Sequence, residues 1–134
     1  MFKTAFLQIG LLTLLISTST HASPATDFSG DYLCGGTDPV RHTDYANIPL
    51  KIIKSNDTFQ LRWDFGDQGG ITLGTGEANI RVDSVLAVVF WDAVDTKSIG
   101  VITYQKQADG SLVGNWTIPN AKVVGTETCR PMLG

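Results

Sequence analysis

The sequence predicts an all-β domain, and the architecture it favours is an eight-stranded up-and-down antiparallel barrel. The clearest observation is the alternation over residues 59–65, where apolar side chains share one face and polar side chains share the other. A second is the stretch 84–116, which has the pattern of three consecutive strands joined by turns. A third is that no segment after residue 22 keeps apolar residues at helical spacing.

Eight segments have the apolar, β-branched and aromatic composition of strands and are separated by turn residues. We predict strands over residues 28–34, 48–53, 59–65, 71–76, 85–91, 99–104, 112–117 and 123–129.

The first four strands are bounded by glycine-rich or polar turns. The first ends at Gly35-Gly36, and the polar segment Val40–Asn47 that follows is the longest predicted loop. Ser55–Asp57 turns the second strand into the third, and Gly66–Gly70 turns the third into the fourth. Gly74 within the fourth strand allows a kink or close packing against a neighbour.

The last four strands are the more apolar half of the domain. Val85–Trp91 is apolar at every position, and Asp95–Ser98 separates it from the next strand. Asp109-Gly110 is a strong hairpin signal, and Pro119-Asn120 makes the last turn. Strands that follow one another through short connections favour an up-and-down barrel, and a meander β-sandwich is the alternative. Eight strands enclose an interior that side chains fill or that holds one small ligand.

The first 22 residues have the pattern of a signal peptide. Lys3 supplies the positive charge, Ala5–Ile16 is an apolar core of about twelve residues, and Ala22 is a small residue suited to cleavage. That core is too short for a bilayer, so a retained membrane anchor is the less favoured alternative. We expect one domain over residues 23–134, exported to the periplasm or outside the cell, with no integral membrane segment after cleavage.

Charge and cysteine content narrow the possible partners. Residues 1–22 hold one of the 10 basic residues and none of the 13 acidic ones, so the net charge of the remainder is −4. Without a basic patch, nucleic acid is not expected as a partner. In an exported chain Cys34 and Cys129 are expected to form a disulfide that joins the first strand to the last. The alternative is a pair of free or metal-binding thiols.

The sequence carries no recognisable catalytic constellation. His42 is the only histidine after residue 22, and no G-x-S-x-G motif is present. The aspartates that could pair for acid–base chemistry stand at strand ends, where aspartate is a common turn residue; they are Asp64, Asp67, Asp92 and Asp95. No calcium-loop pattern is present either. We expect no enzymatic activity, no metal and no cofactor.

Aromatic residues are the more informative candidates for binding. Aromatic rings at a barrel mouth stack on sugars or apolar ligands, and an arginine recognises an anion. The candidate ligand-binding residues are Trp63, Trp91, Tyr104, Trp116 and Arg62. The alternative is that the tryptophans fill the core and the arginine is solvated. In the predicted loop 40–47, the candidate partner-binding residues are Arg41, His42 and Tyr45.

The chain resembles a group of exported bacterial β-domains often labelled fibronectin-binding or uncharacterised. The shared pattern covers nearly all of the chain after the signal: G-D-Y-L at Gly30, G-T-D-P at Gly36, F-Q-L-R-W at Phe59, G-T-G at Gly74, L-A-V at Leu86, G-V-I-T-Y at Gly100, D-G-S-L-V-G-N-W at Asp109 and G-T-E at Gly125. The two cysteines and the acidic segment Asp92–Thr96 depart from it. The resemblance implies an exported all-β domain and assigns no catalytic residue.

A weaker resemblance is to periplasmic lysozyme inhibitors, small barrels with a Tyr-x-Cys near the start bonded to a late cysteine. Tyr32-Leu33-Cys34 and Cys129 fit that frame, but the inhibitory Ser-Gly loop of that group has no counterpart here. We expect a non-enzymatic binding protein acting on a protein, a glycan or a small molecule. The alternative function is inhibition of a host or rival hydrolase through a protruding loop.

The all-apolar strand 85–91 predicts a contact surface. A barrel strand has one inner and one outer face, so one of the sets Val85-Ala87-Val89-Trp91 and Leu86-Val88-Phe90 faces outward. An exposed apolar row of this kind usually marks an interface. We expect this face to pack on another copy, as a homodimer, or on a partner protein.

Overall fold

A computed structural model describes residues 13–17 and 26–133 of the chain. Most of the predicted signal peptide, residues 1–22, therefore lies outside the described residues, and the five of them that are described have no regular secondary structure. None of the helices in the described part of the chain is long and apolar enough to cross a membrane.

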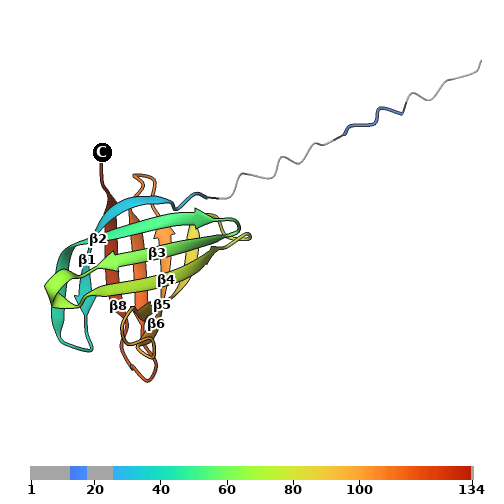
Figure 1. The fold of residues 1–134 in the computed structure, drawn as a ribbon. Helices are drawn as coiled ribbons and strands as arrows, with labels where there is room; N and C mark the ends of the chain where they lie inside the picture. Colours follow the sequence, from blue (N-terminus) through green and yellow to red (C-terminus); the bar gives the residue numbers. More distant parts are fainter. Residues whose placement is uncertain (1–12, 18–25, 134) are drawn as a thin grey trace, which may run out of the picture.

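The domain is a closed antiparallel barrel of eight strands in up-and-down order (Figure 1). Each strand pairs with the next along the chain, and β8 pairs with β1 to close the barrel. The strands are β1 (Gly30–Asp38), β2 (Thr43–Ser55), β3 (Thr58–Asp64), β4 (Ile71–Ala78), β5 (Val85–Asp92), β6 (Ile99–Lys106), β7 (Leu112–Thr117) and β8 (Gly125–Pro131). One 3-10 turn, Gly66–Gln68, lies between β3 and β4. The predicted fold class is confirmed.

Two of the predicted segments are wrong in their boundaries. The predicted loop Val40–Asn47 is mostly hairpin, because β1 continues to Asp38 and β2 begins at Thr43. A shift in register between Cys34 and Gly36 lets the two strands stay paired past the glycines that were predicted to end β1. The last strand begins at Gly125, so the preceding valines, Val123 and Val124, are exposed loop residues.

Alternation along each strand fills the barrel interior. Phe59, Leu61 and Trp63 of β3 are buried while Gln60 and Arg62 are exposed, as the sequence predicts. The buried apolar residues of all the strands form one cluster. Several interior rings lie on a glycine directly across the ladder: the pairs are Tyr45–Gly36, Phe90–Gly100, Tyr104–Gly114 and Trp116–Gly125. Glycine has no Cβ to block the ring, so large aromatics cross the narrow interior.

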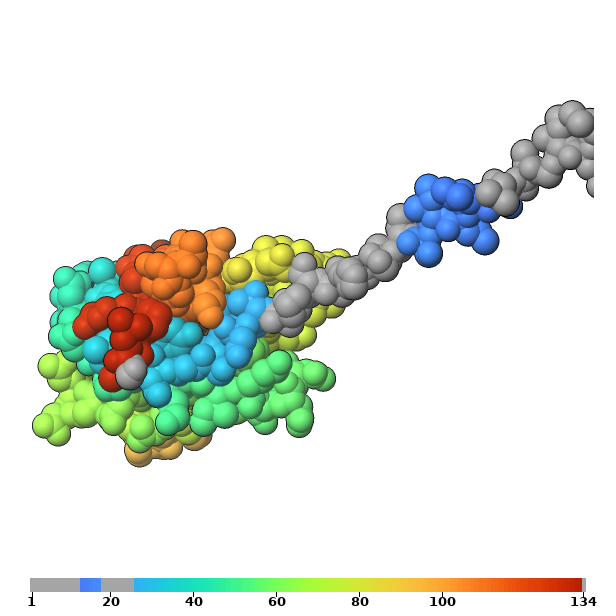
Figure 2. All heavy atoms as spheres, turned by 90° about the horizontal axis from the view of Figure 1, so that it is seen from above, coloured from blue at the N-terminus to red at the C-terminus, as the bar shows by residue number. Residues whose placement is uncertain are grey.

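The N-terminal segment closes one end of the barrel. Phe28 is fully buried, packs edge-on against Phe59 at 5.6 Å, and its carbonyl accepts a hydrogen bond from the Tyr32 hydroxyl. Thr26 accepts a bond from the Ser84 N–H, which ties the segment to the β4–β5 turn. Figure 2 looks onto this end, where the light blue segment lies between orange and green atoms. The partly buried aromatic rings of the interior, Tyr45, Phe65, Phe90 and Trp116, lie at the opposite end.

Candidate functional site

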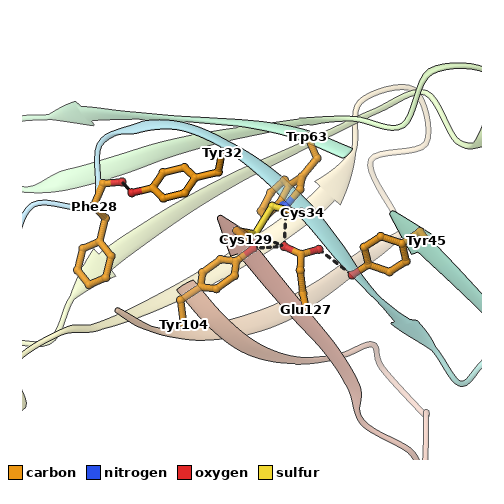
Figure 3. The surroundings of a disulfide bond; sticks show 8 residues. All are labelled: Phe28, Tyr32, Cys34, Tyr45, Trp63, Tyr104, Glu127 and Cys129. Carbon is orange, nitrogen blue, oxygen red and sulfur yellow. Dashed lines mark hydrogen bonds between the residues drawn. A yellow bond between two sulfur atoms is a disulfide. The ribbon is translucent and has the colours of Figure 1, made fainter. Parts of the chain in front are cut away.

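The most unusual group in the interior is the carboxyl of Glu127 on β8, which is only 4% exposed (Figure 3). It accepts hydrogen bonds from the Tyr45 hydroxyl at 2.7 Å and from Trp63 Nε1 at 3.1 Å. The Tyr104 hydroxyl donates a third bond to the same carboxyl. Alternation along β8 turns Glu127 inward together with Gly125 and Cys129.

The disulfide lies beside this carboxyl. Cys34 and Cys129 are bonded, as the sequence predicts, and face each other across the β1–β8 ladder that closes the barrel. Cys129 Sγ lies 3.3 Å from Glu127 Oε1. These three residues bring their ligand atoms together as a metal site would, but both sulfurs are bonded to each other and neither is a thiolate. The cluster is therefore not a metal site, and the alternative of free or metal-binding thiols is wrong.

Burial dominates the electrostatics of this cluster. It raises the pKa of Glu127, and the three donated hydrogen bonds offset only part of that increase. The pKa values of Tyr104 and Tyr45 are also raised, first by burial and then by the neighbouring carboxyl. A raised carboxyl pKa is common at catalytic sites, but a general acid must also reach its substrate. Glu127 is enclosed by its donors, so the arrangement orients three aromatic side chains and does not present an acid to solvent.

Half-buried aromatic rings close the end of the barrel opposite Phe28. They are Tyr45, Phe65, Phe90 and Trp116. Phe90 packs edge-on against Trp63 at 6.2 Å and against Trp116 at 6.4 Å, and Tyr45 packs on Phe65 at 5.6 Å. The nearby Trp116 indole lowers the pKa of the Tyr45 hydroxyl, but this effect is smaller than the increase caused by burial and by Glu127. Within residues 26–133, however, Trp116 Nε1 is buried without a hydrogen-bond partner.

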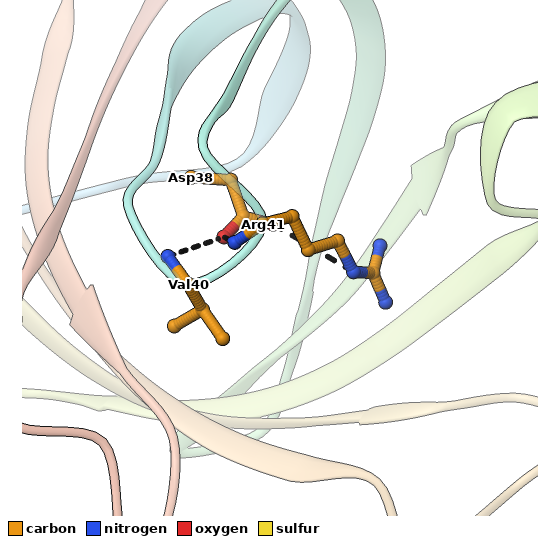
Figure 4. A network of polar contacts seen from close by, with 3 residues as sticks. All are labelled: Asp38, Val40 and Arg41. Atoms are coloured by element: carbon orange, nitrogen blue, oxygen red, sulfur yellow. Dashed lines mark hydrogen bonds and ion pairs between the residues drawn. The ribbon is translucent and has the colours of Figure 1, made fainter.

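The tip of the β1–β2 hairpin lies outside the barrel and is held by Asp38 (Figure 4). Asp38 Oδ1 accepts hydrogen bonds from the backbone N–H of Val40 at 3.1 Å and of Arg41 at 3.0 Å. Asp38 Oδ2 also lies 4.0 Å from Arg41 Nε. His42 follows with a positive φ of 57°, a conformation uncommon for residues other than glycine. The tip is thus an ordered turn with exposed Val40, Arg41 and His42.

The predicted ligand-binding residues do not form one site. Trp63, Tyr104 and Trp116 lie inside the barrel, and the first two are fully engaged with Glu127. Trp91 and Arg62 lie on the outer wall, where they line a depression of about 210 Å³ together with Lys51. Tyr45, predicted as a loop residue, belongs to β2 and turns inward. Of the three predicted partner-binding residues, Arg41 and His42 are at the tip.

Glu127 was missed by the sequence reasoning, although one signal was available. Residues two apart on a strand share a face, so an inward Cys129 requires an inward Glu127. The aspartates, by contrast, are turn formers as predicted. Asp92 accepts the N–H groups of Val94 and Asp95, and Asp64 accepts that of Gly66. They do not converge on Glu127.

Comparison with protein-family models and with curated protein sequences finds no match to this chain.

Proposed function

We propose that this protein is an exported, non-enzymatic binding protein that recognises a partner protein through the tip of its β1–β2 hairpin, residues 39–42. The observation that carries the proposal is the order of that tip. Its backbone is fixed by Asp38 before any partner arrives, so little conformational entropy is lost on binding.

The chemistry of the tip suits a protein surface. Val40 is 43% exposed and the Arg41 side chain is 76% exposed, so an apolar group and a cation stand side by side. Arginine is enriched among the residues that dominate binding energy at protein interfaces. A glycan partner, the other class expected from the sequence, would more often be met by an exposed aromatic ring, which the tip lacks.

The packing of the barrel interior favours recognition of a partner on the outer surface over binding inside the barrel. Its apolar residues pack as one cluster, and its carboxyl is used by three internal donors. The depressions associated with Trp91 and Ala87 are both on the outer wall. A buried disulfide is compatible with the oxidising compartment that export implies.

The alternative function is inhibition of a hydrolase, in which the same tip enters an active-site cleft. An ordered, projecting turn is the feature that favours it, since protease and lysozyme inhibitors need a loop that keeps its shape in the complex.

Binding is tested by immobilising the protein, capturing partners from envelope and host extracts, and titrating each captured protein against tip variants. Val40→Asp and Arg41→Ala are expected to weaken binding by about tenfold or more, the range for interface anchor residues. Lys54→Ala is the matched control, because it removes a cation from the other end of β2. Equal binding by the tip variants and the wild type would refute the proposed site. If the wild-type protein lowers the activity of a lysozyme in a panel and the Val40→Asp variant does not, the alternative function as a hydrolase inhibitor is supported.

A further inference from the structure

The outer face of β5 carries the apolar row that the sequence predicts. Alternation along this strand buries Leu86 and Val88 and turns Ala87 and Val89 outward. Trp91 follows two residues after Val89, so it is on the same outer face, where it is half-buried. The Trp91 indole therefore belongs to the outer wall and not to the interior.

A row of outward side chains connects Trp91 to two cations on neighbouring strands (Figure 1). Lys51 of β2 stands directly across from Arg62 of β3. Arg62 stands in turn across from Leu73 of β4, and Leu73 stands across from Trp91. Because paired strands are about 4.8 Å apart, the row from Lys51 to Trp91 is about 14 Å long.

The depression of about 210 Å³ described above lies along this row. All four residues of the row line it, and so does Gln60, which is two residues before Arg62 on the same face of β3. Drug-sized ligands occupy pockets of about 300–1,000 Å³, so this depression suits a smaller unit such as one sugar ring.

The charged residues that line the depression are both cations, Lys51 and Arg62; of the described residues, no acidic one lines it. Each cation has an aspartate beside it: Lys51 Nζ lies 3.9 Å from Asp31 Oδ1, and Arg62 Nη1 lies 3.9 Å from Asp64 Oδ2. All four side chains are between 44% and 61% exposed, and exposed ion pairs of this kind are worth little. An anion in the depression therefore competes with two weak, solvated contacts.

The pairing of Lys51 with Arg62 is itself unfavourable for folding. Like charges that stand directly opposite each other on one face of a sheet destabilise it. A local arrangement that works against the fold is expected at functional sites. An anion bound between these two cations removes the repulsion, since the planar arginine fork matches a carboxylate and the lysine adds a second positive charge.

The other half of the depression is apolar, because it is lined by Leu73 and the Trp91 indole. A matching ligand has an anionic group on one side and an apolar face on the other. A uronic acid residue of a glycan has both, in its carboxylate and in the C–H face of its ring, and aromatic side chains supply rigid contact area for such a face. An acidic peptide has carboxylates but no ring to pack on the indole.

We propose that this depression binds an acidic glycan through one uronic acid residue, with the carboxylate on Arg62 and Lys51, the ring on Leu73 and Trp91, and a hydroxyl group on the Gln60 amide. The hairpin tip is not part of this site. Binding of the glycan and binding of the protein partner proposed above are therefore separable.

Isothermal titration of the disulfide-bonded protein at low ionic strength tests the ligand class. The probes are oligomers of galacturonic, glucuronic and mannuronic acid, with methyl-esterified oligogalacturonate and oligoglutamate for comparison. At least one uronic acid oligomer is expected to bind, and its binding is expected to weaken as salt is added. The methyl ester, which lacks the carboxylate charge, is expected to bind about tenfold or more weakly than the acid.

Variants of the depression test its place on the wall. Arg62→Ala and Trp91→Ala are each expected to weaken binding of the uronic acid oligomer by about tenfold or more. Arg62→Lys keeps the charge but loses the fork, so a smaller loss is expected. Arg81→Ala is the matched control, because it removes a cation between β4 and β5, outside the depression, and is expected to leave binding unchanged. Val40→Asp at the hairpin tip is also expected to leave it unchanged.

Four results would overturn the proposal. They are no binding of any uronic acid oligomer, equal binding of the methyl ester, equal or tighter binding of oligoglutamate, and full binding by Arg62→Ala or Trp91→Ala. Of these, the oligoglutamate result would assign the depression to an acidic peptide. Circular dichroism and urea midpoints of each variant separate a lost site from a lost fold.

Discussion

The carboxyl of Glu127 gives the sharpest test of how the barrel interior is built. Replacing it by alanine leaves Tyr104 and Trp63 with buried donors and no acceptor, while Tyr45 is half-buried and can turn toward water. Each stranded donor costs about 1–3 kcal/mol, so Glu127→Ala is expected to lose about 3–6 kcal/mol once the cavity is included. That is a large part of the 5–15 kcal/mol typical of a domain.

Glu127→Gln separates the hydrogen bonds from the charge. The amide oxygen can accept from Tyr104 and Trp63, and its NH₂ group can donate to the Tyr45 hydroxyl, so the expected loss at mildly acidic pH is below about 1 kcal/mol. Glu127→Ala and Glu127→Gln both remove the ionisable carboxyl, yet their free energies of unfolding are expected to differ by several kcal/mol.

The pH dependence follows from the raised pKa of Glu127. The folded state holds the Glu127 proton more tightly than the unfolded state does. Protonation of Glu127 therefore stabilises the fold, and this stabilising effect is complete below the ordinary glutamate pKa. That effect is lost as pH rises through the raised value, with a slope of at most about 1.4 kcal/mol per pH unit. The lowered pKa values of Asp27, Asp92 and Asp109 act in the opposite direction and at lower pH.

Urea unfolding followed by tryptophan fluorescence from pH 4 to pH 8 measures both effects, with the range set by the ordinary glutamate pKa of about 4.3. The stability of the wild type relative to Glu127→Gln is expected to fall as pH rises. A difference that stays constant across this range would refute the raised pKa. An alanine variant within about 1 kcal/mol of the wild type would refute the buried network.

Three further predictions concern the disulfide, the core and the glycines. Replacing Cys34 and Cys129 by alanine is expected to lower the free energy of unfolding by up to about 4–5 kcal/mol, since the bond closes a loop of 95 residues, and the native chain should be two hydrogens lighter than the reduced one by mass spectrometry. Trp63→Ala is expected to cost about 3–5 kcal/mol in urea unfolding, whereas a loss below about 1 kcal/mol would contradict its place in the core. Gly36→Ala is expected to cost about 1–3 kcal/mol because its Cβ would meet the Thr126 carbonyl and the Tyr45 hydroxyl; Gly35→Ala, whose nearest neighbour is 3.2 Å away, is the control and should cost less.

Local sequence determined the strands and the direction of most side chains. On β3 the alternation of Phe59, Leu61 and Trp63 with polar residues is a property of the extended backbone itself, so it can be read without knowing any neighbour. The same holds for the Asp109-Gly110 turn, where a positive φ at Gly110 suits the hairpin. The alternation of β5 likewise predicted an outward apolar row before its neighbours were known.

Pairing between distant strands decided the rest. The donors to Glu127 come from residues 82, 64 and 23 positions away, so no local pattern marks them as partners. The polar composition of Val40–Asn47 predicts a loop, yet pairing with β1 holds the part from Thr43 onward as strand. Trp91 and Trp63 are indistinguishable by composition, but the ladder turns one outward and the other toward the carboxyl. The sequence by itself determined which segments are extended and which side chains share a face, because those depend on a few consecutive residues. Closure of the barrel decided which polar groups are buried together, because that depends on the register of strands that meet only in the folded chain.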